Sequence, residues 1–168
     1  MNSEYAVLLS IHPRHCAKIA AKEKTFELRK QIPNLPVPFK CYIYCTKQQC
    51  RSDAFNIPIT REELLSDISV NGMKCLNKYG NGTVWAEFIC DRIENYESFD
   101  YDKVAEAACI TPEVIQRYAS GRTIHGLHIS ALHIYNKPRE LTEFCVGATG
   151  IPMMRPPQSW CYVKEISA

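Results

Sequence analysis

The chain contains short apolar runs and short segments in which apolar and polar residues alternate, and most of these predict β-strands. Residues 7–11 form an apolar run that is typical of a buried strand. Residues 25–30 alternate, so Phe26 and Leu28 would face one side of a strand while Glu27 and Arg29 face the other. Further strands are predicted over residues 41–46, 83–90, 125–135 and 159–163.

Helical patterns are fewer and shorter. Pro13 follows the first apolar run and suits the first turn of a helix. One face of this helix would carry Cys16, Ile19, Ala20 and Glu23, and another, basic face would carry Arg14, Lys18 and Lys22. Other short helices are predicted over residues 61–67, from Pro112 to a stop at Gly121, and after Pro138.

The order of these elements limits the fold class. Strands and helices do not alternate regularly, which disfavours a parallel α/β sheet. An α+β fold is favoured instead, built as a small mixed β-barrel with peripheral helices. With 168 residues, 46% of them apolar, the chain suits one domain with one core. We therefore predict a single domain over residues 1–168, with residues 47–82 as an excursion from the barrel.

Composition indicates a reducing, cytoplasmic location. No apolar run is long enough to span a membrane, and residues 1–5 do not resemble a secretory signal. The nine cysteines are therefore expected to be free thiols. Cys41 and Cys45 alternate with tyrosines and lack the spacing of a zinc site, so we interpret them as small buried hydrophobic residues. No metal or other cofactor is expected.

Positive charge is concentrated near the first predicted helix. Residues 12–30 contain six Lys or Arg and two Glu, a local net charge of +4, whereas the whole chain carries only +2. Such a concentration favours an anionic partner, such as a nucleic-acid backbone or a nucleotide. The simpler alternative is a solvated basic face with no ligand.

Glu27 and Arg29 also admit two interpretations. They lie two residues apart on a predicted strand, so their side chains share one side. They could form a surface ion pair of little energetic consequence. Alternatively, they could line a cavity between the first helix and the barrel, where the carboxylate would accept hydrogen bonds from a base and the guanidinium would hold an anion.

Several segments resemble the ASCH family, which belongs to the PUA-like superfamily of small β-barrels. They are residues 8–13, 24–29 and 129–141. Residues 155–163 are similar to the final strand of phage- or prophage-type members. The family signature GxKxxExR is matched by Lys24, Glu27 and Arg29, but Lys22 replaces its glycine. Glycine would leave the helix easily with a positive φ, and lysine does so only at an energetic cost.

The resemblance implies a pocket, formed by the first helix and the barrel, that binds RNA or a modified nucleobase. The function we expect is therefore RNA or nucleotide binding. The expected ligand-binding residues are Arg14, Lys18, Lys22, Lys24, Glu27 and Arg29. By the same comparison, residues 47–82 and the helices at 102–120 would be additions to the family's core.

Two alternatives remain open. Some ASCH-like proteins are enzymes. If the resemblance extends to activity, this chain would be a ribonuclease or an acylated-cytidine amidohydrolase that uses Lys24, with Glu27 as a second catalytic group. The amidohydrolase group uses a lysine, a threonine and a glutamate, and Glu27 stands where its threonine is expected. The second alternative is an interaction module in which residues 47–82 contact a host or phage protein.

Overall fold

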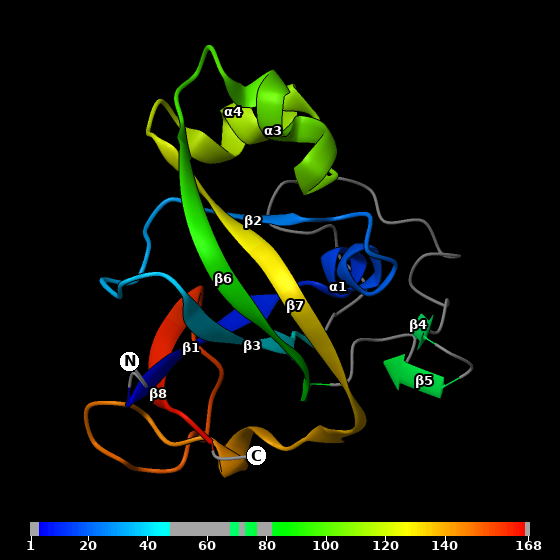
Figure 1. The fold of residues 1–168 in the computed structure, drawn as a ribbon, viewed down its shortest axis with the longest axis vertical. Coiled ribbons are helices and arrows are strands. Elements are labelled where there is room, and N and C mark those ends of the chain that lie inside the picture. Colours follow the sequence, from blue (N-terminus) through cyan, green and yellow to red (C-terminus); the bar gives the residue numbers. More distant parts are fainter. Residues whose placement is uncertain (1–3, 48–67, 71–72, 77–81, 167–168) are drawn as a thin grey trace.

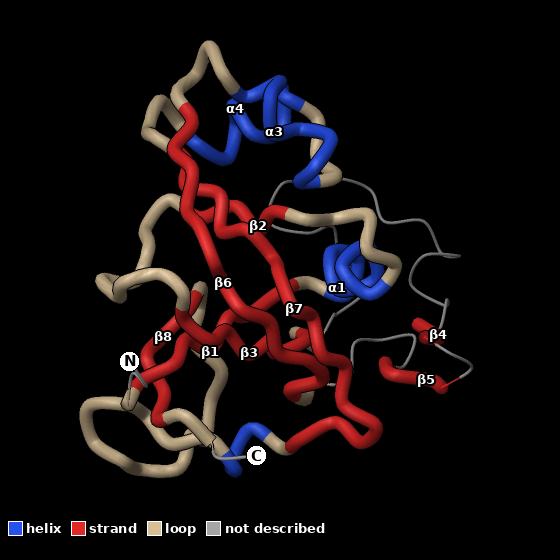
Figure 2. Tube along the Cα trace, in the orientation of Figure 1, coloured by secondary structure: helices blue, strands red, loops and turns tan. Residues whose placement is uncertain are grey.

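The computed structural model describes residues 4–47, 68–70, 73–76 and 82–166 (Figure 1). Strands dominate the trace and the helices are short, as Figure 2 shows. In chain order the elements are β1 (Tyr5–Ile11), α1 (Pro13–Ala20), β2 (Phe26–Arg29), β3 (Phe39–Cys45), β4 (Ile68–Val70), β5 (Met73–Leu76), β6 (Val84–Tyr96), α3 (Tyr101–Ala108), α4 (Pro112–Ala119), β7 (Ile124–Arg139), the 3-10 helix η1 (Leu141–Glu143) and β8 (Trp160–Lys164).

Six strands form one mixed sheet in the order β2-β7-β6-β3-β1-β8. Only the β1–β3 pair is parallel, and the other neighbours are antiparallel. The long strands β6 and β7 run side by side across the molecule (Figure 1). The predicted α+β class with a mixed sheet is confirmed. Backbone pairing among the described strands leaves β2 and β8 at the two ends of the order, so the sheet is not closed.

Side chains link the two ends of this open sheet. Trp160 of β8 donates its indole N–H to the carbonyl of Gln31, just beyond β2, at 2.9 Å. The hydroxyl of Tyr162 accepts a hydrogen bond from the Asn34 backbone at 2.7 Å. Arg29 Nη2 donates to the carbonyl of Ser10 in β1 at 2.9 Å. We call these three bonds the seam, because they connect the β2 end of the sheet to β1 and β8.

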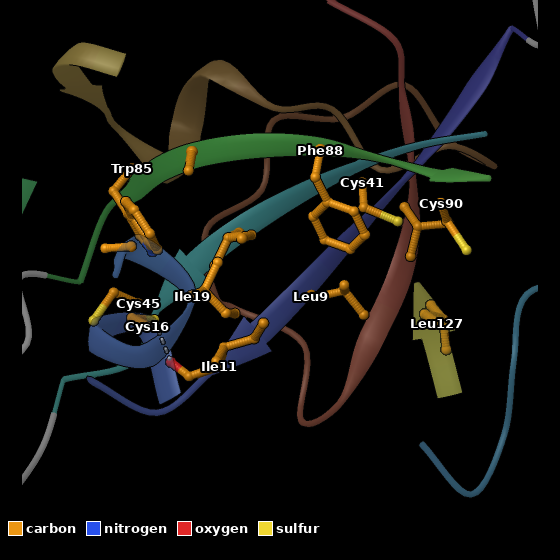
Figure 3. Packing of buried hydrophobic residues seen from close by; sticks show 14 of the residues in the cluster. Leu9, Ile11, Cys16, Ile19, Cys41, Cys45, Trp85, Phe88, Cys90 and Leu127 are labelled. Atoms are coloured by element: carbon orange, nitrogen blue, oxygen red, sulfur yellow. Dashed lines mark hydrogen bonds between the residues drawn. The ribbon is translucent and has the colours of Figure 1, made fainter. Parts of the chain in front are cut away.

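The main core lies between α1 and the sheet. Cys16, Ile19 and Ala20 are buried on one face of α1, as the apolar pattern predicted. Figure 3 shows this face close to Trp85 of β6 and Cys45 of β3. The seven described cysteines are free thiols, and both Cys45 and Cys41 are fully buried. Their predicted role as small core residues is confirmed.

Helices α3 and α4 pack at one end of β6 and β7 (Figure 1). They bury a second apolar cluster with Phe26 and Leu28 of β2 and Tyr96 of β6. The predicted start of α4 at Pro112 is confirmed. Its end is also close to the expected one, since Ser120 and Gly121 adopt the left-handed conformation after Ala119.

Two predicted helix boundaries are wrong. Helix α1 ends at Ala20, so neither Glu23 nor Lys22 belongs to it, because Lys22 has φ of 60° and the chain turns out of the helix. Pro138 does not open a helix but lies near the end of β7, which is longer than expected. The 3-10 helix begins only at Leu141, where Glu140 and Glu143 form a capping box.

The predicted helix over residues 61–67 lies outside the described residues. Most of the excursion over residues 47–82 lies outside them too. Its described part, β4 and β5, forms a separate antiparallel pair beside α1 and β7. The boundaries of the excursion therefore stay a prediction. In the part of the chain that the structure describes, no helix is long and apolar enough to cross a membrane.

Candidate ligand-binding cavity

A cavity of about 400 Å³ lies between α1, β2 and α4. One wall is polar and is formed by His15, Lys24, Glu27 and Arg29. A second wall is mostly apolar and is formed by Ile110, Val114, Ile115 and Tyr118. The ends of β1 and β3, together with Gln158 and Ser159, complete the lining.

Lys24 is held at the base of the polar wall and is only 2% exposed. Its Nζ donates to the carbonyl of Ala108 at 2.9 Å and lies 3.3 Å from Glu27 Oε2. Ala108 is the last residue of α3, so its carbonyl belongs to the negative end of that helix dipole. A helix terminus and a carboxylate together stabilise the buried ammonium.

Glu27 lies between two cations. Its Oε2 faces Lys24, and its Oε1 is 3.0 Å from Arg29 Nη2. Burial by itself would raise the pKa of Glu27, but the charges of Lys24 and Arg29 outweigh burial and lower it. The carboxylate is therefore ionised at neutral pH, and the Lys24–Glu27–Arg29 group carries a net charge of +1.

The turn between α1 and β2 places Lys24 on this wall. Lys22 has the positive φ expected of the signature glycine, at 60°. The backbone N–H groups of Glu23 and Lys24 both donate to the carbonyl of Lys18, at 3.0 and 3.1 Å. The signature turn is thus kept despite the substitution, at a cost of about 1 kcal/mol for a left-handed residue that is not glycine.

His15 comes from α1 and is partly buried in the polar wall. Burial, with the charge of the Lys24 ammonium acting in the same direction, lowers the pKa of His15 to about 4. The imidazole is therefore neutral at physiological pH, with one nitrogen that donates and one that accepts. A neutral imidazole beside an ionised carboxylate can hydrogen-bond an uncharged polar ligand.

The structure divides the six predicted site residues into two groups. Lys24, Glu27 and Arg29 meet at the cavity, which combines the two interpretations of the Glu27–Arg29 pair: they form an ion pair, and the pair lies in a cavity wall. Arg14, Lys18 and Lys22 are not among the lining residues. Lys18 is exposed and pairs with Glu23 at 2.6 Å, and Lys22 is exposed beyond the helix end.

Sequence reasoning did not identify His15 or the α4 wall. The helices at 102–120 were interpreted as additions, yet α3 holds Lys24 and α4 supplies the apolar wall. One signal was present: Val114 and Tyr118 are four residues apart and therefore share a face of α4. Within the described ranges, no group of three or more His, Cys, Asp or Glu side chains could hold a metal ion.

Comparisons with known proteins agree with this architecture. A scan of protein-family models and a search of curated proteins found no match. Among solved structures, ASCH from Zymomonas mobilis is similar at 16% identity, with 95% of this chain and 88% of that chain covered and a TM-score of 0.61. A single-site mutant of the same protein is similar at 14% identity, covering 95% and 91% with a TM-score of 0.62. The chain therefore has an α+β fold similar to that of the ASCH protein of Zymomonas mobilis.

Proposed function

We propose that this chain is an RNA- or nucleotide-binding domain whose ligand enters the cavity between α1 and the sheet. The observation that carries the proposal is the Lys24–Glu27–Arg29 group, which is held in the wall of a cavity large enough for a small ligand. Taking three charges out of water is costly, and it would not by itself stabilise the fold. A ligand-recognition role gives a reason for placing them at a cavity.

The two walls fit the two chemical parts of a nucleotide base. A volume of about 400 Å³ is in the range of small-molecule sites. On the polar wall, Glu27 accepts hydrogen bonds, and the neutral His15 donates one and accepts another. The apolar wall of α4 suits the flat face of a base ring.

The cations outside the cavity would serve the phosphate backbone. Lys18 is exposed on α1, and Lys22 is exposed in the turn that connects α1 to Lys24 in the cavity wall. Arg14 also belongs to α1. Flexible exposed lysines bind phosphate through charge and do not need a fixed geometry. The shared fold with ASCH proteins and the signature match at the cavity support this assignment.

A salt titration of binding to single-stranded RNA tests the proposal. The logarithm of the affinity should fall with the logarithm of salt concentration by about 0.7 for each phosphate neutralised. Lys18→Gln and Lys22→Gln should each reduce this slope by about 0.7. Lys164→Gln, on β8 away from the cavity, is the control and should leave the slope unchanged. No binding at low salt, or binding that does not depend on salt, would overturn the proposal.

The contacts of Lys24 disfavour the enzyme alternative. A nucleophilic lysine must lose its proton, whereas both neighbours of Nζ, the Ala108 carbonyl and the Glu27 carboxylate, stabilise the ammonium. Incubation with RNA and with acylated cytidine, comparing wild type with Lys24→Ala, tests this alternative. Turnover that disappears in the variant while RNA binding persists would favour an enzyme.

A further inference from the structure

Tyr118 crosses from α4 to the end of β2 at the cavity. Its ring lines the cavity, and Lys30 Nζ lies 4.7 Å from the ring centroid, within the range of a cation–π contact. Burial raises the pKa of Tyr118, and hydrogen bonds with the Lys30 backbone and the Arg29 side chain oppose this only in part. The phenol is thus anchored beside Arg29 of the Lys24–Glu27–Arg29 group.

The wall that carries Tyr118 is firmly attached to the fold. Ile115 and Ala119, on the same helix, are buried in the cluster that includes Phe26 and Leu28. Val114 lines the cavity one turn before Tyr118. An aromatic ring on a packed helix is a pre-organised platform, because little side-chain entropy is lost when a ligand packs on it.

Lys30 differs from Lys24 in how its charge is balanced. Lys24 is buried and paired with Glu27. Lys30 is only partly buried, lines the cavity, and has no carboxylate within ion-pairing distance among the residues with described side chains. An uncompensated ammonium beside an aromatic ring suits a ligand that combines an anionic group with a flat ring.

We propose that Tyr118 is a ligand-binding residue for a single nucleobase, which packs on Tyr118 and Val114 while the phosphate of the same nucleotide lies at Lys30. This inference rests on the proposed function and names the ligand class more narrowly: one unstacked nucleotide enters the cavity. Arg29 and Glu27, which also line the cavity, would then face the polar edge of the base.

Calorimetric titrations with dissected ligands test the assignment. The four ribonucleoside 5′-monophosphates carry ring and phosphate, ribose 5-phosphate lacks the ring, and the nucleosides lack the phosphate. At least one nucleotide should bind the wild-type protein, and ribose 5-phosphate should bind at least tenfold more weakly. Tyr118→Leu should weaken nucleotide binding about tenfold and leave ribose 5-phosphate binding unchanged.

Two further variants test the Tyr118 hydroxyl and the Lys30 charge, and a third is a control. Tyr118→Phe keeps the ring and should stay within a few-fold of wild type. Lys30→Gln should weaken the binding of the nucleotide but not of the nucleoside. Tyr5→Leu removes a tyrosine of β1 that does not line the cavity, and it should have no effect. Should Tyr118→Leu fail to fold, the wild-type ligand series and Lys30→Gln still test the assignment: equal binding of nucleotide and ribose 5-phosphate, or unchanged nucleotide binding in Lys30→Gln, would overturn it.

The outcomes that overturn this inference differ from those that overturn the proposed function. Equal loss of nucleotide and ribose 5-phosphate binding in Tyr118→Leu would make Tyr118 structural only. An unchanged nucleotide affinity in that variant would remove its role altogether. Salt-dependent RNA binding without any mononucleotide binding would overturn this inference and leave the proposed function in place. Absence of both RNA binding and mononucleotide binding would overturn this inference and the proposed function.

Discussion

The basic residues around the turn between α1 and β2 fall into two contrasting regions. Lys18 and Lys22, before and at the turn, are exposed to solvent. Lys24 and Arg29, after the turn, are directed to the cavity and share one buried carboxylate. Local net charge treats these residues alike. Burial separates them, and only the second region combines charge with a defined geometry.

The same type of ion pair therefore has different energetic consequences in the two regions. The Lys18–Glu23 pair is about half exposed on both side chains and is screened by water and salt. The Lys24–Glu27 pair is almost fully buried, with side-chain exposures of 1% and 8%. A charge that loses its partner there has little water to replace it. Three pairs of substitutions can break or sharpen this contrast.

Removing the buried carboxylate should have the largest effect. Glu27→Ala leaves Lys24 and Arg29 buried without their shared partner, and we expect a loss of about 3–5 kcal/mol in the free energy of unfolding. Glu23→Ala removes the matching exposed partner and should cost less than about 1 kcal/mol. Urea unfolding of both variants measures the difference. Equal effects would show that the cavity wall is as well hydrated as the helix surface.

Acidification should have the next largest effect, through His15. Because its folded-state pKa is about 4, below the ordinary 6.5, the unfolded state binds the proton more readily. The contribution of neutral His15 to the free energy of unfolding is complete above pH 6.5. It falls by at most about 3 kcal/mol as the pH drops towards 4. The pKa of Glu27 is also lowered, so the free energy of unfolding falls further as the pH drops below the ordinary pKa of a glutamate.

Two histidine variants isolate this effect from general acid unfolding. His15→Gln should make the free energy of unfolding less dependent on pH between 7 and 4. His133→Gln changes an exposed histidine of β7 and should keep the wild-type pH dependence. If His15→Gln also keeps the wild-type profile, the cavity does not hold His15 in its neutral form.

The turn residue should give the smallest effect, with the opposite sign. Lys22→Gly places glycine at a φ of 60° and should stabilise the protein by up to about 1 kcal/mol. Lys18→Gly, inside α1, should destabilise it by about the same amount because glycine weakens a helix interior. Thermal unfolding compares the two. Destabilisation by Lys22→Gly would mean that the lysine side chain makes a stabilising contact that exceeds its backbone cost.

Local patterns and the family signature predicted most strands and three residues of the polar wall, but not His15. Strand alternation placed Glu27 and Arg29 on one side. Lys24 came from the resemblance to the family signature, and the cavity remained one of two interpretations. The end of α1 was missed because helix periodicity alone continues through Lys22, whereas the chain there is left-handed. Strand β7 was underestimated because its pairing with β6, which extends to Arg139, is a tertiary contact.

The apolar half of the site depends on long-range contacts, which a local pattern does not encode. Lys24 finds its acceptor at Ala108, 84 residues later. Val114 and Tyr118 share a helix face, but nothing in that spacing shows that the face meets β2. Hydrophobic periodicity indicates which side of a helix is buried and leaves open what buries it.

Arg29 uses the same nitrogen, Nη2, for Glu27 and for the Ser10 carbonyl of the seam. One guanidinium thus takes part both in the cavity wall and in the contact that joins the ends of the sheet. A ligand that contacts Arg29 acts directly on the hydrogen bond that joins β2 to β1. Because such coupling is reciprocal, a ligand that strengthens this hydrogen bond is itself bound with higher affinity when the hydrogen bond is formed. Occupancy of the cavity would then be visible at a distance, as slower amide exchange along the joined strand ends.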